Sequence, residues 1–114
     1  MPMIALTTSV RIADNEKELL KEGLGHAITL LPGKSENSLM ISLSDDTPMY
    51  FRGKKAREAA FLEVSCFGLG QPRAYEEMTG EVCRLLEETL GISPANVYIK
   101  YTETVHWGTD GRNL

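Results

Sequence analysis

The two halves of the chain repeat each other at a constant offset of 58 residues. Adding 58 to Ile4 gives Leu62, and the same offset maps Gly33 onto Gly91 without a gap. The other matched pairs are Leu6 with Val64, Leu20 with Met78, Leu24 with Val82, Ile28 with Leu86, Ser35 with Ser93, Leu39 with Val97, and Ile41 with Ile99. Because one register aligns apolar positions over most of the chain, we expect both halves to form the same structural unit.

Each half has the pattern of a strand, a helix and a second strand. Residues 3–8 and 38–44 are typical of strands, and apolar residues recur at helical spacing between them. Asp14 is the expected cap of this first helix, and Pro32-Gly33 is expected to stop it.

The second half repeats the pattern. Strands are expected over 59–66 and 95–101, with a helix that begins near Pro72 and stops at Gly91. The connection between the halves is expected to be a loop. We interpret its basic cluster as a solvated turn; the cluster consists of Arg52, Lys54, Lys55 and Arg57.

These units predict an α+β fold in a single domain over residues 1–114. The βαβ repeats, approximately 2–44 and 60–101, are expected to form one four-stranded mixed sheet with both helices on one face. The other face has a mixed composition and would leave large side chains in water, so we expect a closed oligomer to cover it. The large side chains on that face are Met3, Met40, Phe61 and Tyr98.

Composition narrows the class of protein. The chain has 12 Lys and Arg against 16 Asp and Glu, a formal net charge of −4, which argues against general nucleic-acid binding because that relies on neutralising phosphates. No membrane span and no signal peptide is evident, so we expect no membrane partner and a cytoplasmic location. Cys66 and Cys83 are too far apart for a CxxC motif, and no metal site is expected.

Proline at position 2 is the first candidate for chemistry. Removal of Met1 would make Pro2 a secondary amine at the start of a strand, and burial or a neighbouring cation would favour its neutral, basic form. Lys34, in the turn after the first helix, is the candidate cation. The alternatives are that Met-Pro has no functional meaning and that Lys34 only complements the helix C-terminus.

Short motifs distributed over nearly the whole chain form one set: Met-Pro-Met at the start, Pro-Gly-Lys at 32–34, Met49, Phe51, Gly53, Ser65, Ile92-Ser93-Pro94, Val97-Tyr98-Ile99, Tyr101, Val105 and Trp107. With this set, the sequence resembles the macrophage migration inhibitory factor (MIF) family of the tautomerase superfamily. The resemblance implies a homotrimer in which three sheets close into a barrel, with each site between neighbouring subunits.

The resemblance also implies an activity: cofactor-independent keto–enol tautomerisation of phenylpyruvate-like acids and of dopachrome. Pro2 would be the general acid and base, and Lys34 would bind the substrate carboxylate and lower the proline pKa. Tyr98 matches a pocket tyrosine from the adjacent subunit. Val105 and Trp107 match residues at the pocket mouth.

Two substrate-binding positions depart from the family pattern. Cys66 stands where the family usually has a pocket isoleucine, and Lys100 stands in place of an asparagine. Lys100 would add a second cation, which would lower the Pro2 pKa further or favour a more acidic substrate.

Two other functions remain open at this stage. One is a MIF-like cytokine mimic or binding protein with vestigial tautomerase activity, secreted without a signal peptide and acting on a receptor protein. The other is a different reaction of the superfamily, such as decarboxylation or dehalogenation, for which Lys100 leaves room.

Overall fold

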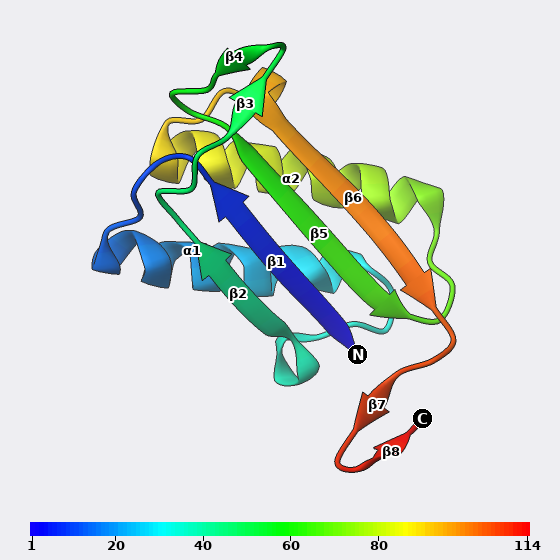
Figure 1. The fold of residues 1–114 in the computed structure, drawn as a ribbon. Helices are drawn as coiled ribbons and strands as arrows, with labels where there is room; N and C mark the ends of the chain where they lie inside the picture. The colour runs from blue at the N-terminus through cyan, green and yellow to red at the C-terminus, as the bar shows by residue number, and fades with distance from the viewer.

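A four-stranded sheet forms the centre of the computed structural model, which describes residues 1–114 (Figure 1). The strand order is β2-β1-β5-β6. The strands are β1 (Pro2–Thr8), β2 (Met40–Ser44), β5 (Ala60–Phe67) and β6 (Val97–Thr104). Within each half the two strands pair parallel, and β1 joins β5 antiparallel. The predicted βαβ repeats and mixed sheet are therefore confirmed.

Two helices, α1 (Asp14–Ala27) and α2 (Pro72–Leu90), cover one face of this sheet (Figure 1). Neither combines the length and apolar character that crossing a membrane requires. Single turns of 3-10 helix follow at Ile28–Leu30, Glu36–Ser38 and Pro94–Asn96.

The helix ends show one wrong prediction. The N-cap of α1 is Ala13, and Asp14 is already the first helical residue. The Glu16 carboxylate accepts the Ala13 N–H at 2.8 Å, so a side chain inside the first turn satisfies this backbone donor. By contrast, α2 begins at Pro72 as expected. It ends at Leu90 and is capped by Gly91, whose φ of 70° is the left-handed conformation that glycine adopts at little cost.

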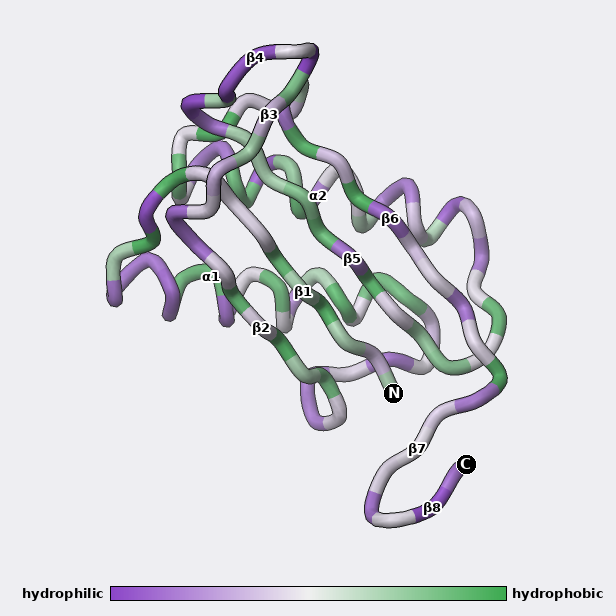
Figure 2. The backbone as a smooth tube through the Cα atoms, in the orientation of Figure 1, coloured by the Kyte–Doolittle hydropathy of each residue, from purple (hydrophilic) through white to green (hydrophobic).

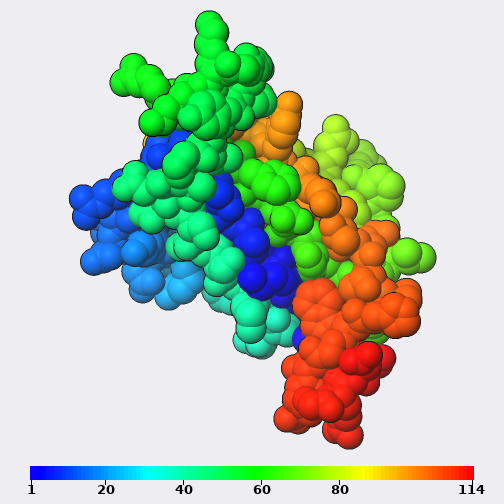
Figure 3. All heavy atoms as spheres, in the orientation of Figure 1, coloured from blue at the N-terminus to red at the C-terminus, as the bar shows by residue number.

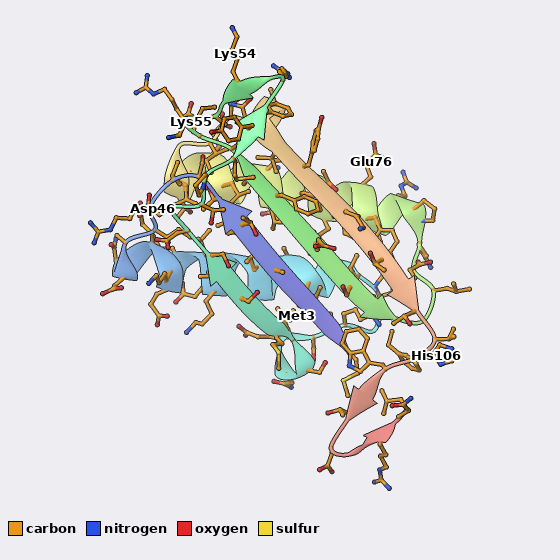
Figure 4. The ribbon with its side chains drawn as sticks, in the orientation of Figure 1. Met3, Asp46, Lys54, Lys55, Glu76 and His106 are labelled. Carbon is orange, nitrogen blue, oxygen red and sulfur yellow. The ribbon has the colours of Figure 1, made fainter.

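Two hairpins lie outside the predicted elements. The inter-half connection contains β3 (Tyr50–Phe51) and β4 (Lys54–Lys55), joined by a turn at Arg52 and Gly53 with φ of 56° and 78°. Lys54 and Lys55 project from it away from the body (Figure 4). A second hairpin, β7 (Gly108–Thr109) with β8 (Arg112–Asn113), follows β6 near the C-terminus.

The two sheet faces differ in burial. On the central strands β1 and β5 the side chains that face the helices are buried, and the tube of Figure 2 alternates in hydropathy along these strands as a half-buried sheet should. The opposite face carries no helix, and its side chains lie open in Figure 3, with Met40 68% and Tyr98 64% exposed. The buried helix-facing residues come from β1, β5 and the start of β6, and Ile41 and Leu43 of β2 are partly buried against them. They are Ile4, Leu6, Ala60, Leu62, Val64, Cys66 and Val97.

Candidate active site

The start of β1 lies opposite the ends of the two strands beyond it. Pro2 pairs with Cys66 on β5, and Cys66 pairs with Glu103 on β6. Paired residues point to the same face of a sheet, so the three side chains form a row across three strands. Pro2 and Cys66 are both buried beneath the helix layer.

Lys34 reaches this row from the turn after the first helix. Its backbone N–H bonds to the carbonyl of Leu31, which closes the turn, and its ammonium donates to the carbonyl of Phe67 at 2.9 Å. Phe67 in turn donates its N–H to the carbonyl of Met1 at 3.1 Å. The cation is thereby held beside the N-terminal end of β1.

The N-terminal amine lies in an environment that lowers its pKa. Burial lowers the pKa of the α-amino group of Met1 below its ordinary value, and the Lys34 ammonium lowers it further. Both effects favour the uncharged amine at neutral pH. They act at the point where the chain enters β1.

A small cavity of about 60 Å³ lies against Lys34. Burial raises the pKa of the Cys66 thiol in its wall, so this cysteine presents an uncharged side chain to the cavity. The lining residues are Leu31, Pro32, Lys34, Cys66, Leu69, Gly70, Gln71 and Tyr75.

Glu103 and Tyr75 belong to this region, and the sequence reasoning did not find them as site residues. The Glu103 carboxylate accepts the Tyr75 hydroxyl at 2.7 Å and the Gly70 N–H at 2.6 Å. A usable signal was present, because Glu103 continues the every-second-residue row of Val97, Ile99 and Tyr101. The strand was predicted to end at residue 101, one alternation too early, which hid this carboxylate.

Trp107 and Pro2 both belong to the lining of a second hollow. This hollow is a broad groove of about 570 Å³. Met3 and His106, both labelled in Figure 4, line it as well. The C-terminal segment holds Trp107 through a bond from the Leu114 N–H to the Trp107 carbonyl at 2.9 Å. Val105 is 67% exposed and does not line this groove.

Tyr98 and Lys100 lie away from Pro2 within one chain. Tyr98 pairs in register with Phe61 and meets the ring of Phe51 edge-on, with ring centroids 5.3 Å apart. Lys100 forms an ion pair with Glu63 at 3.6 Å on the open face. A single chain therefore joins Pro2, Lys34 and Cys66 and does not join them to Tyr98 or Lys100.

Comparison with known proteins gives a consistent result. The family described as macrophage migration inhibitory factor (MIF) matches residues 1–112. The crystal structure of Leishmania major MIF2 is 30% identical, with a TM-score of 0.92, over 100% of this chain and 97% of that one. A MIF homologue from Prochlorococcus marinus is 27% identical, with a TM-score of 0.82, over 97% of each chain.

A more distant structure shares the fold. Pt0534, in a form inactivated by 2-oxo-3-pentynoate, is 14% identical with a TM-score of 0.85 over 96% of this chain and 93% of that one. A search among curated proteins gives no match. The family match over nearly the whole length and the fold it shares with these structures lead to one conclusion: this chain belongs to the MIF family of the tautomerase superfamily.

Proposed function

We propose that this protein is a cofactor-independent keto–enol tautomerase that acts on phenylpyruvate-like or dopachrome-like substrates. The observation that carries the proposal is the N-terminal amine, partly buried at the start of a central strand with Lys34 beside it. After removal of Met1, the same burial and the same cation would act on the secondary amine of Pro2. An uncharged amine at working pH is what a general base requires.

The proposed reaction moves one proton between two atoms of the substrate. In the enol-to-keto direction, the Pro2 nitrogen takes the proton of the enol hydroxyl as the carbonyl forms. The resulting ammonium then gives a proton to the adjacent carbon, and the amine returns to its starting state.

Lys34 has the donors that this reaction needs. Its ammonium has three N–H groups, and the carbonyl of Phe67 occupies one of them. The others are free to bind a substrate carboxylate and to stabilise negative charge that develops on the enolate oxygen.

We further propose that the working enzyme is a homotrimer with sites between its subunits. The support is the uncovered sheet face and the distance of Tyr98 and Lys100 from Pro2 within one chain. A neighbouring subunit would bring these two side chains to the cavity mouth. Because Lys100 forms an ion pair with Glu63, its positive charge would be partly neutralised in the site.

The decisive experiment compares three forms in an assay with a phenylpyruvate-type enol, each checked by intact mass for Met1 removal. Pro2→Gly retains an amine in a looser backbone, and we expect kcat/KM to fall by roughly 10²-fold. Inserting one alanine before Pro2 turns its nitrogen into an amide, so the residual rate should be lower still. Equal rates in all three forms would remove Pro2 from the chemistry.

A chemical probe gives an independent test. Pt0534 is inactivated by 2-oxo-3-pentynoate, and the same 2-oxo acid should label this protein at the Pro2 nitrogen. Peptide mapping by mass spectrometry would locate the adduct. Labelling at Cys66 in place of Pro2 would contradict the assignment of the amine as the reactive group.

A second candidate function is a MIF-like binding protein that engages a receptor, either inside the cell or after export without a signal peptide. The observation that favours it is the β3–β4 hairpin region, where Arg52, Lys54, Lys55 and Arg57 are exposed and form no ion pair. Such a surface suits an acidic partner. Replacing Lys54 and Lys55 by glutamate should abolish receptor binding and leave tautomerase activity unchanged.

A further inference from the structure

The cavity beside Lys34 has a second charged group at its edge that the proposed reaction does not use. Gly70 and Tyr75 line the cavity together with Lys34. The Glu103 carboxylate accepts hydrogen bonds from the Gly70 N–H and from the Tyr75 hydroxyl. An ammonium therefore lines the cavity directly, and a carboxylate is bonded to two of its other lining residues.

The Pro2 end of β1 and the Glu103 carboxylate lie on different sides of Cys66. Strand β5 separates β1 from β6, so Cys66 lies between Pro2 and Glu103 in the row that crosses the sheet. Neighbouring strands are about 4.8 Å apart, which places the backbones of Pro2 and Glu103 about 10 Å apart. This span is comparable with the length of an aryl-substituted pyruvate, so a substrate bound at Lys34 and Pro2 extends toward Tyr75.

Tyr75 is fixed in position. Its ring stacks on Tyr101, with centroids 4.4 Å apart, and the Tyr101 hydroxyl donates to the Tyr75 carbonyl at 3.0 Å. Because its hydroxyl hydrogen is donated to Glu103, the Tyr75 oxygen has only acceptor lone pairs left for a ligand. The bond from Tyr75 also lowers the pKa of Glu103, which keeps the carboxylate charged at neutral pH.

Resting on the proposed function, we propose that Tyr75 and Glu103 determine substrate specificity: they favour monoanionic 2-oxo acids and reject those with a second carboxylate at the end away from the reacting carbon. Such a carboxylate would meet a negative charge and a phenol oxygen with no hydrogen to donate. Tyr75 is the residue in contact with the substrate. Glu103 acts through it and is a positioning residue.

The test uses the enol of phenylpyruvate and its para-carboxy analogue on purified protein with Met1 removed. Glu103→Gln keeps an acceptor oxygen for Tyr75 and Gly70 and removes only the charge. Glu76→Gln makes the same change on a side chain of α2 that projects away from the sheet and is the matched control (Figure 4). Tyr75→Phe removes the hydroxyl that ties Glu103 to the cavity.

We expect the wild type to prefer the monoanionic substrate by about five- to tenfold in kcat/KM, and the difference should appear in KM. The reason is the repulsion between two carboxylates, which solvent partly screens. Glu103→Gln should remove most of this preference without lowering kcat, and Tyr75→Phe should reduce it. Glu76→Gln should leave it intact. A wild type without preference, or a preference that Glu103→Gln leaves unchanged, would overturn the inference.

Calorimetric binding of 3-phenylpropanoate and its para-carboxy analogue, which cannot tautomerise, separates this inference from the proposed function. Discrimination in binding without turnover of either enol would reject the tautomerase activity and support the charge selection. Turnover with equal binding of the two analogues would do the reverse.

Discussion

The Lys34 ammonium connects two parts of the site, because one cation both lowers the amine pKa and supplies donors for a carboxylate. A base works only when it is uncharged, so activity rises as the pH passes upward through its pKa. Lowering that pKa extends activity to lower pH. At the scale of single residues, the pH profile is therefore the most informative observable.

Lys34→Gln should move the acid limb of the kcat/KM profile to higher pH, because removing a neighbouring cation raises the amine pKa. KM should rise as well, since the carboxylate loses its charged partner. Lys21→Gln, on the exposed side of α1, is the control and should leave the profile unchanged. An acid limb that stays in place or moves to lower pH in Lys34→Gln would show that Lys34 does not act on the base.

At the scale of elements, a glycine of α1 packs closely against a side chain of α2. A Cβ added at Gly23 of α1 would overlap the end of the Leu85 side chain on α2. A Cβ added at Gly80, which lies on α2, would meet only open space. The same substitution at the two sites therefore separates packing from helix propensity.

Gly80→Ala should stabilise the protein by roughly 0.5–1 kcal/mol, because alanine loses less conformational freedom in a helix. Gly23→Ala gains the same stabilisation from helix propensity. Overpacking against Leu85 costs about 1–3 kcal/mol, so its net effect should be destabilising. Thermal unfolding followed by circular dichroism gives both signs. A higher Tm for both variants would contradict this prediction and would mean that the two helices accommodate the added methyl group at Gly23 without strain.

At the scale of the whole molecule, the face of the sheet opposite the helices is the main surface that no other part of the chain covers. Met40 and Tyr98 are largely exposed there, and neither helix covers this face (Figure 3). A face of this kind in a family member is the basis for expecting a homotrimer. The open groove beside Pro2 and Trp107 lies on the same side, so assembly and activity should depend on each other.

Light scattering coupled to size exclusion should give three times the chain mass of 12.6 kDa for the wild type. Met40→Glu should shift this toward the monomer, because it places a charge in the expected interface while costing the isolated chain little. Leu19→Glu, on α1 and 49% exposed, is the matched control and should remain trimeric. A wild-type monomer would refute the assembly.

Much of the architecture could be predicted because it depends on local patterns. Apolar residues at every second position mark the strands, the period of the helices marks the other elements, and the 58-residue offset shows that the pattern occurs twice. The β3–β4 and β7–β8 hairpins escaped prediction because strands of two residues have no measurable period.

The site divides in the same way. The sequence by itself determined that Pro2 starts a strand and that Lys34 follows a helix, because both are properties of neighbouring residues. Only the tertiary structure decided which side chains meet. Tyr75 and Glu103 are 28 residues apart in the chain, and they touch because α2 packs over β6 and because β6 runs to Thr104. The register between strands then decides that a carboxylate, a thiol and the N-terminal segment share one row, since hydrogen-bonded pairing places side chains that no local pattern connects.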